Sequence, residues 1–367
     1  MSRFNLQEIC THFFYQGTVN KVLPIGEGFI NDSFVVYTNL SGGEKYLLQR
    51  KNKNIFVNVP EMMENINKVT THIQRKIKAS GGNPQRGTLT LIPTISGKLY
   101  HLDKDEEFWT VCEFIKDSIT YEKVDSTDIA YAGGKGVGQF QSQLVDFSEP
   151  LTDILPGFHN MRFRFQQWDN VISKDPVGRC ASLQKEIGWI EDRRDEMMSF
   201  WKLVETGIIP QRVVHNDTKI SNVLFDKNGE VLCMIDLDTV LYNTVLTDFG
   251  DAIRSYTNTG LEDEKDLTKV KFDIKRFDAF ARGYLEEAGN FLIKEELEYL
   301  PFAAQYITFE QVLRFLMDYL DGDNYYKIHY PEHNLIRSKA QFKLLTDMED
   351  KFIDMKTSIE NALKYQN

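Results

Sequence analysis

Two kinds of hydrophobic pattern follow one another along this chain of 367 residues. In the first 115 residues, short apolar stretches separated by turn-forming residues predict strands, with a short amphipathic helix within 4–16. One longer segment, 60–79, has helical periodicity, begins with a proline and is followed by two glycines, which are common start and stop signals of a helix. The strands are expected at 19–23, 29–38, 44–49, 89–93, 99–102 and 108–114.

From about residue 117 the apolar positions recur every three or four residues, and this spacing predicts helices. We therefore expect an α+β fold with two unequal lobes, a strand-rich nucleotide-binding lobe at 1–115 and a helical lobe at 116–367 that carries the substrate site. A cleft between two such lobes is a natural place for a nucleotide and a substrate. The helices are expected at 125–146, 160–171, 180–206, 268–289, 294–320 and 334–365.

One segment interrupts the helical pattern and carries the strongest chemical signal. From Val213 to Asp238 it reads VVHNDTKISNVLFDKNGEVLCMIDLD, with an Asn-Gly turn between two apolar runs, which predicts a hairpin. The hairpin would bring Asp236 back beside Asp217 and Asn222. Kinase-type phosphoryl transfer needs a carboxylate beside the acceptor hydroxyl, with an amide and a second carboxylate to hold Mg²⁺. The segment therefore predicts a kinase, whereas an exposed hairpin with solvated acids is the alternative.

A glycine-containing turn precedes this segment, between the first two predicted strands. Gly26 and Gly28 would let backbone amides approach phosphate oxygens closely, although an ordinary hairpin turn uses glycine as well. Its place ahead of the catalytic hairpin favours the phosphate role. Asn31 and Asp32 follow the turn, and we expect them near the mouth of the cleft, where polar groups can bind a substrate.

Two further segments are expected to contact the nucleotide. In the third strand, Gln49 and Arg50 stand where kinases carry a lysine for the phosphates. Because a strand alternates its faces, only one of the two should face the cleft, and the pattern leaves the choice open. The stretch around Glu113 and Ile115 joins the lobes, and we expect its backbone to bind the edge of adenine, with a plain edge strand as the alternative.

Other motifs resemble functional signals without matching them. The glycine-rich run 133–138 lacks the G-x-x-x-x-G-K-[ST] pattern, so we interpret it as a helix face where small residues permit close packing. Asp248 begins the letters DFG, but Asp236 already occupies the end of the hairpin. We expect Asp248 and Asp251 to anchor the catalytic loop, with Arg254 as an ion-pair partner of one of them.

Arg314 and Asp318 lie one turn apart in a predicted helix. This spacing allows an ion pair on a solvated face. The neighbouring residues are largely apolar, so a guanidinium that reaches the cleft is an equal alternative.

Composition narrows the class of protein. A formal net charge of −11 argues against nonspecific binding to nucleic acid. The four cysteines lack metal-ligand or disulfide spacing, so we expect buried thiols. No run of eighteen apolar residues and no apolar amino-terminal segment is present, so we expect a cytoplasmic protein with no membrane partner. The oligomeric state cannot be read from the sequence.

Together, the segments GEGFINDSF, YLLQR, VVHNDTKISNVLF, MIDLDTV, DFGDAIRS and RFLMDYLDGDNYYKIHYPEHNLIR resemble the aminoglycoside phosphotransferase/choline kinase superfamily, which has the protein-kinase-like fold. Within it the chain is most similar to the N-acetylhexosamine 1-kinases. This resemblance implies ATP-dependent phosphorylation of a free N-acetylhexosamine, GlcNAc or GalNAc, at its anomeric hydroxyl, with Mg²⁺ as cofactor. The alternatives are a kinase of the same fold for choline, homoserine, methylthioribose or an aminoglycoside, and a nucleotide-binding pseudokinase.

The resemblance also implies roles for single residues. Asp217 would be the catalytic base, with Lys219 offsetting charge on the transferred phosphoryl group. Asn222 and Asp236 would hold Mg²⁺. The expected sugar contacts are Asp217, Arg314, Asn31 and Asp32. The expected nucleotide contacts are Gly26, Gly28, Gln49, Arg50, Glu113 and Ile115, where Gln49 departs from the usual lysine.

Overall fold

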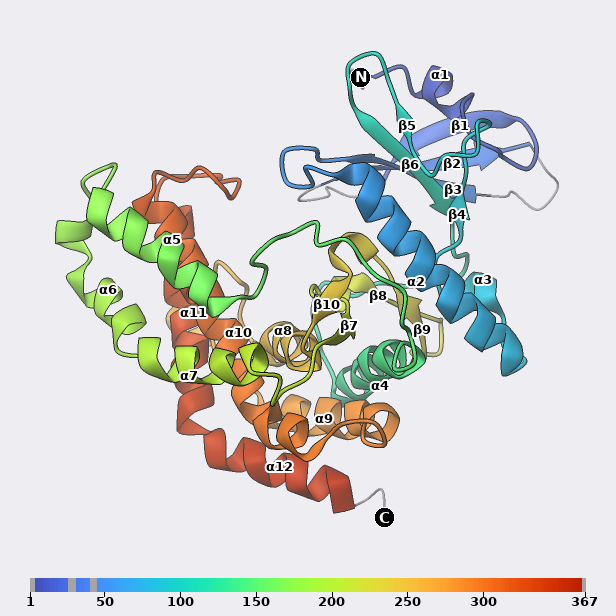
Figure 1. Cartoon of the computed structure of the whole chain (residues 1–367). Coiled ribbons are helices and arrows are strands. Elements are labelled where there is room, and N and C mark those ends of the chain that lie inside the picture. Colours follow the sequence, from blue (N-terminus) through green and yellow to red (C-terminus); the bar gives the residue numbers. More distant parts are fainter. Residues whose placement is uncertain (1–3, 26–30, 40–44, 365–367) are drawn as a thin grey trace.

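The computed structural model describes residues 4–25, 31–39 and 45–364. Its first lobe is built on a six-stranded antiparallel sheet (Figure 1). The strands lie in the order β1-β2-β3-β6-β4, and β5 pairs with the beginning of β6. Their bounds are β1 Val19–Pro24, β2 Asp32–Thr38, β3 Lys45–Lys51, β4 Leu91–Ile92, β5 His101–Leu102 and β6 Phe108–Glu113.

One face of this sheet has a small apolar core of its own. Alternate side chains of the central strands, including Leu48 and Trp109, pack there against helix α1 (Leu6–Cys10). Because successive side chains of a strand point to opposite faces, Gln49 and Lys51 lie on the other face of β3. That face is turned toward the second lobe, since Lys51 bonds to a residue there.

Helix α2 (Val59–Ala79) runs between the sheet and the helical lobe (Figure 1). The side chain of Asn58 caps its first turn by accepting a hydrogen bond from the backbone N–H of Glu61. Its apolar side chains, such as Met62 and Ile66, are buried in the large core of the second lobe. This helix therefore packs with the helical lobe, and the short helix α3 (Pro84–Gly87) follows it.

The second lobe is helical. Its bounds are α4 Thr127–Gln143, α5 Met161–Lys174, η1 Cys180–Ser182, α6 Gln184–Glu191, α7 Arg194–Glu205, α8 Val245–Thr257, η4 Leu267–Lys269, α9 Ile274–Ala288, α10 Lys294–Leu320, α11 His333–Asp350 and α12 Phe352–Lys364. Helix α10 is buried over most of its length, with α5, α8 and α11 packed around it. The helices expected at 180–206 and 334–365 are each divided in two. Both halves of each pair face the same core, so the apolar spacing continues across the break and conceals it.

Helices α4 and α9 approach each other closely through glycines. A methyl group on Gly134 would lie 2.2 Å from the carbonyl oxygen of Phe280, and one on Gly283 would lie 2.1 Å from the carbonyl oxygen of Tyr131. Neither position accepts a larger residue unless a helix moves. The expectation that the run 133–138 is a packing face is therefore confirmed.

Short strands interrupt the helices, as the sequence indicates. Strand β8 (Val223–Phe225) pairs with β9 (Val231–Met234), which confirms the predicted hairpin, and Gly229 in its turn has a φ of +86°. Strand β7 (Arg212–Val214) pairs with β10 (Leu241–Asn243), a contact that the pattern did not predict. Single turns of 3-10 helix, η2 (Ile220–Asn222) and η3 (Leu237–Thr239), flank the hairpin.

The α+β class with two lobes is thus confirmed. The four cysteines are buried free thiols, as expected. Within the described ranges, no helix is both long enough and apolar enough to span a bilayer.

Candidate active site

Asp217, Lys219 and Asn222 form one hydrogen-bonded group after strand β7. The Lys219 ammonium donates to Oδ2 of Asp217 at 2.8 Å, and the Asn222 amide donates to the same oxygen at 2.9 Å. The same amide also donates to the backbone carbonyl of Asp217 at 2.8 Å. Among the described residues, no group donates to the second carboxylate oxygen, Oδ1. One oxygen of Asp217 is therefore held in place while the other can meet an acceptor hydroxyl.

The charge of Lys219 sets the protonation state of Asp217. Burial acts to raise the pKa of Asp217, but the adjacent ammonium and the Asn222 hydrogen bond outweigh it, so the pKa lies below its ordinary value. Burial likewise acts to lower the pKa of Lys219, and the charges of Asp217 and Asp236 raise it instead. Both groups are therefore ionised at neutral pH.

Asp248 of α8 anchors the backbone that leads into Asp217. One of its carboxylate oxygens accepts from the N–H of His215 at 3.0 Å, and the other accepts from the N–H of Asn216 at 2.7 Å. The predicted anchoring role of Asp248 is confirmed. The expected ion pair of Arg254 is also found, with Asp251 at 3.0 Å.

Asp236 lies between β9 and η3, where its backbone is left-handed with a φ of +60°. The N–H of Ile235 donates to the carbonyl of Asn222 at 2.9 Å, so the two expected Mg²⁺ ligands have adjacent backbones. Within the described part of the chain, no group donates a hydrogen bond to the Asp236 carboxylate. Burial and the neighbouring charge of Asp238 raise its pKa.

This environment fits a divalent cation. Carboxylates that repel one another, together with an amide oxygen, are ligands that Mg²⁺ accepts in phosphoryl-transfer sites. No cluster of three or more His, Cys, Asp or Glu side chains able to hold a metal occurs in the described ranges. An ion held by Asn222 and Asp236 would therefore take its remaining ligands from phosphate and water.

Lys51 joins the sheet to the catalytic segment. Its ammonium lies 2.7 and 2.8 Å from the two carboxylate oxygens of Asp238, and both side chains are only 4% exposed. Asn31 donates to Asp238 at 2.8 Å, and Lys51 also donates to Gln49 at 2.9 Å. Our sequence interpretation missed Lys51. The alternation of faces along a strand could have identified Lys51, because it places this residue on the same face as Gln49.

Arg50 lies on the opposite face of β3, and this placement corrects our expectation that it is an alternative phosphate contact. Its guanidinium is 5.3 Å from the ring centroid of Phe4 and bonds to Asp32 and Glu107, each at 2.7 Å. Asp32 is its cross-strand partner, so the expected sugar contact from Asp32 also falls on the face that carries α1. Alternate residues of a strand share a face, so Arg50 faces the same side of the sheet as Leu48. Asp32, its cross-strand partner, faces that side as well.

The remaining expected nucleotide contacts lie near the hairpin or outside the described ranges. Ile115 is buried against Leu224 of β8, and Glu113 ends β6 two residues earlier. The segment that joins the lobes therefore lies beside the catalytic hairpin. Gly26 and Gly28 are outside the described residues, and their phosphate role stays a prediction.

Arg314 lies on α10 among aromatic rings. Its guanidinium is 5.4 Å from the ring centroid of Tyr326 and 5.6 Å from that of Tyr325. Asp318 instead accepts hydrogen bonds from the backbone N–H groups of these two tyrosines, at 2.8 and 3.0 Å. Within the described residues no ion pair joins Arg314 to Asp318, so that alternative is not the arrangement found.

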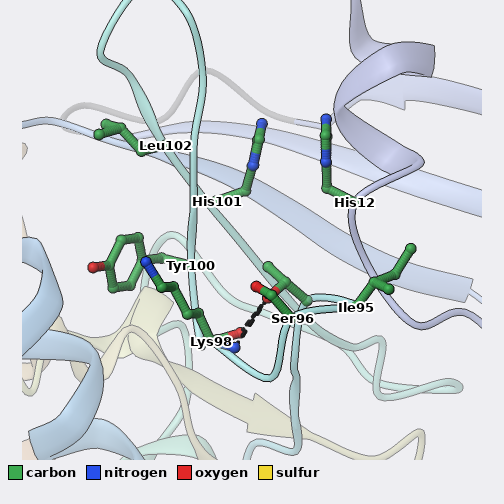
Figure 2. Close-up of a pocket in the computed structure, with 8 residues that line it drawn as sticks. His12, Ile95, Ser96, Lys98, Tyr100, His101 and Leu102 are labelled. Carbon is green, nitrogen blue, oxygen red and sulfur yellow. Dashed lines mark hydrogen bonds between the residues drawn. The ribbon is translucent and has the colours of Figure 1, made fainter.

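Two hollows lie outside this group of residues. One, of about 270 Å³, is bordered by Phe158, Trp201 and Asn216, close to the catalytic loop. The other, of about 640 Å³, lies on the first lobe, where the rings of His12 and His101 stack with centroids 3.8 Å apart (Figure 2). All its lining residues come from the first lobe, so it takes no part in positioning the catalytic loop.

Solved structures share this fold at low sequence identity. An aminopropanol kinase associated with a microcompartment superposes with a TM-score of 0.64 at 14% identity, covering 96% of this chain and 98% of that one. An aminoglycoside phosphotransferase from Alicyclobacillus acidocaldarius gives 0.63 at 12%, covering 98% of each chain. A spectinomycin phosphotransferase in complex with ADP and spectinomycin gives 0.61 at 13%, covering 95% of this chain and 98% of that one. These similarities confirm the kinase-like fold.

A family model described as the phosphotransferase enzyme family matches residues 21–292. The matched region contains the sheet, the catalytic hairpin and the Asp248 anchor. It therefore includes Lys219 and Asn222, which bond to Asp217, and Asp248, which holds the backbone before it. This chain belongs to the phosphotransferase enzyme family, and it shares the fold of the aminoglycoside phosphotransferases and the aminopropanol kinase compared above.

Proposed function

We propose that this protein is an ATP-dependent kinase that phosphorylates the anomeric hydroxyl of a free N-acetylhexosamine, GlcNAc or GalNAc, to give the sugar 1-phosphate. The arrangement at Asp217 is the observation that best supports phosphoryl transfer. One carboxylate oxygen is held by Lys219 and Asn222, whereas the other carries no hydrogen bond from the described residues. The choice of sugar rests on the resemblance of segments such as IDLDTV and DFGDAIRS.

The chain's own residues account for the main steps. Asp217 orients the sugar hydroxyl through Oδ1 and accepts its proton as the new oxygen–phosphorus bond forms and the bond to ADP breaks. Because the pKa of Asp217 is low, orientation is its larger contribution. Lys219 offsets charge on the transferred group. Mg²⁺ held by Asn222 and Asp236 would supply charge neutralisation at the phosphates.

On the nucleotide side we assign the phosphate contact to Lys51 rather than Arg50. Lys51 faces the second lobe, where it bonds to Asp238, two residues beyond the expected metal ligand Asp236. A phosphate oxygen is a strong acceptor and can replace one carboxylate contact of the ammonium. Gln49 shares this face and would support Lys51 through their hydrogen bond.

On the acceptor side we assign sugar recognition to Arg314. Its charge lies among the rings of Tyr325, Tyr326 and Phe158, the last at 5.9 Å. Aromatic faces and a guanidinium suit a neutral sugar, whereas a cationic acceptor such as choline would meet like charge. Asn31 already uses its amide on Asp238, so it would contact the sugar only by exchanging that partner.

A panel assay tests the proposal. ADP release would be measured with GlcNAc, GalNAc, glucose, choline, ethanolamine, homoserine and an aminoglycoside, and phosphorus NMR would locate the phosphate on the product. We expect turnover with the N-acetylhexosamines and a phosphate on C1. The methyl glycoside of GlcNAc is the matched control, because it lacks the anomeric hydroxyl and should be inactive. Turnover restricted to amines, or retained with the glycoside, would contradict the proposal.

A further inference from the structure

Two histidines hold the peptide bond between Asn216 and Asp217 from its two ends. The carbonyl oxygen of Asn216 lies 3.1 Å from Nε2 of His159. The N–H of Asp217 donates to Nδ1 of His215 at 3.2 Å. This carbonyl and this N–H belong to one planar peptide unit, so the two rings together fix its orientation. We call the two rings and this peptide unit the histidine clamp.

The hydrogen bonds require different protonation states in the two rings. Nδ1 of His215 accepts a hydrogen bond, and Nε2 lies 2.8 Å from the carbonyl oxygen of Ile235, so His215 is neutral with its proton on Nε2. His159 faces an acceptor on each side, because its Nδ1 lies 2.6 Å from the carboxylate of Glu310. A carbonyl and a carboxylate only accept, so both nitrogens of His159 must carry protons. His159 is therefore an imidazolium.

The surroundings of His159 favour that charge. The residue is 3% exposed, and Glu310 on α10 bonds at the same time to Arg164 of α5 at 2.8 Å. Asp251 on α8 adds negative charge near the ring, while Arg314 on α10 adds positive charge near Glu310. Burial acts to lower the pKa of His159, and the Glu310 carboxylate outweighs it, so the pKa is raised. The pKa of Glu310 is correspondingly low, because His159 and Arg164 outweigh its burial.

The clamp holds a backbone conformation that a residue with a Cβ seldom adopts. Asn216 has a φ of +65°, in the left-handed region. Such a conformation persists only where the surroundings impose it, and it is common at functional sites. The Asn216 amide also donates to the carbonyl of Thr239 at 3.0 Å, so both its backbone and its side chain are held. The next residue in the chain is Asp217.

We propose that His159 is a positioning residue for phosphoryl transfer, acting through the Asn216 carbonyl on the orientation of Asp217. The inference rests on the proposed kinase activity and adds a residue to it. A hydrogen bond from a charged donor is stronger than one from a neutral ring, so the imidazolium holds the peptide unit firmly. His159 contacts neither nucleotide nor sugar in this scheme, so its loss acts on kcat and not on ATP affinity.

Protonation of His159 can be measured without any substrate. Protein labelled with nitrogen-15 histidine would be studied by NMR, and the His159 signals would be assigned from their loss in His159→Gln. We expect both ring nitrogens of His159 to carry protons at neutral pH, while His215 shows a single protonated nitrogen. A neutral His159 would overturn the proposal, whatever reaction the protein catalyses.

Kinetics test the positioning role. His159→Gln should lower kcat by roughly 10- to 100-fold with the KM for ATP nearly unchanged, since a small misplacement of a catalytic group has an effect of this order. His72→Gln is the matched control, because His72 bonds to Asp146 on the exterior and should keep full activity. A His159→Gln protein with wild-type kcat would overturn the proposal.

A second variant separates positioning from folding. Glu310→Gln keeps an acceptor for His159 but removes the charge that stabilises its proton, so the pKa of His159 falls. The clamp is strongest while His159 is protonated, and it weakens as pH rises through this pKa, because a neutral ring donates a weaker hydrogen bond. Glu310→Gln should therefore lose kcat with rising pH across the neutral range, where the wild type does not. A variant with a lower Tm but an unchanged pH profile would overturn the proposal. Absence of turnover with every acceptor in the wild type would instead contradict the kinase function and leave the NMR result standing.

Discussion

The two sides of the site hold their charged groups by different means. In the helical lobe, the backbone of residues 215–217 is held by buried side chains, Asp248 on one side and His159 on the other. On the side of the sheet lobe, a charged side chain pairs with one from the helical lobe, as Lys51 does with Asp238. A backbone held by buried groups keeps its geometry with or without a ligand, whereas a side-chain pair can exchange one partner for a phosphate. We therefore expect the acceptor side to be preorganised and the nucleotide side to exchange partners.

The largest expected effect is on kcat, from a substitution of Asp217 at the centre of the preorganised side. Asp217→Asn keeps the shape of the side chain but removes the charge that orients and deprotonates the acceptor. We expect kcat to fall by about 10²- to 10⁴-fold, with ATP affinity within a few-fold of the wild type. Turnover and calorimetric titration with ATP would measure the two quantities. A mutant that keeps a tenth of kcat would remove Asp217 from this role.

Asp236→Ala tests the point where the two sides meet. Loss of a carboxylate ligand should weaken Mg²⁺-dependent nucleotide binding by at least about 100-fold, since the partners of metal ligands alone contribute about 10- to 100-fold. Calorimetry with ATP, in the presence of Mg²⁺ and of a chelator, would separate metal-dependent from metal-independent affinity. Unchanged affinity for Mg·ATP would move the assignment to Asp238.

Arg314→Ala tests recognition of the acceptor. Loss of a charged hydrogen bond costs about 1.5–3 kcal/mol, so kcat/KM for GlcNAc should fall roughly 10- to 100-fold while the KM for ATP stays nearly constant. Arg193→Ala is a matched control, because Arg193 pairs with Glu349 away from the catalytic loop. Equal damage to both KM values, together with a lowered Tm, would show that Arg314 is structural.

The smallest effect is expected at Lys51, whose ammonium can exchange a carboxylate contact for a phosphate oxygen. Lys51→Met should raise the KM for ATP about tenfold, the effect of one charged hydrogen bond of about 1.5 kcal/mol. Arg50→Met is the paired variant on the opposite face, where we expect an unchanged KM for ATP and a stability loss of about 1–3 kcal/mol, because the largely buried Glu107 loses this partner. Steady-state kinetics and thermal unfolding would distinguish the two. The reverse outcome would return the phosphate role to Arg50.

Much of the fold could be predicted because it is encoded locally. The boundaries of α10 follow from apolar spacing, and the hairpin follows from Asn228-Gly229 between two apolar runs. The breaks within 180–206 and 334–365 could not be predicted, because apolar spacing records which face is buried and not where a helix bends. Strands β7 and β10 were not predicted for another reason. Each has three residues, which are too few to show an alternating pattern.

The sequence by itself therefore determined which residues gather around Asp217 and the identity of the Asp248 anchor, because these residues lie within one short segment or in the helix soon after it. Only the tertiary structure decided which face of β3 lies toward that segment. Lys51 is on that face, and Arg50 is on the opposite one. The tertiary structure alone also placed His159 between Glu310 and the Asn216 carbonyl, residues far apart along the chain. Contacts across such separations depend on how whole helices pack, and no local spacing records that.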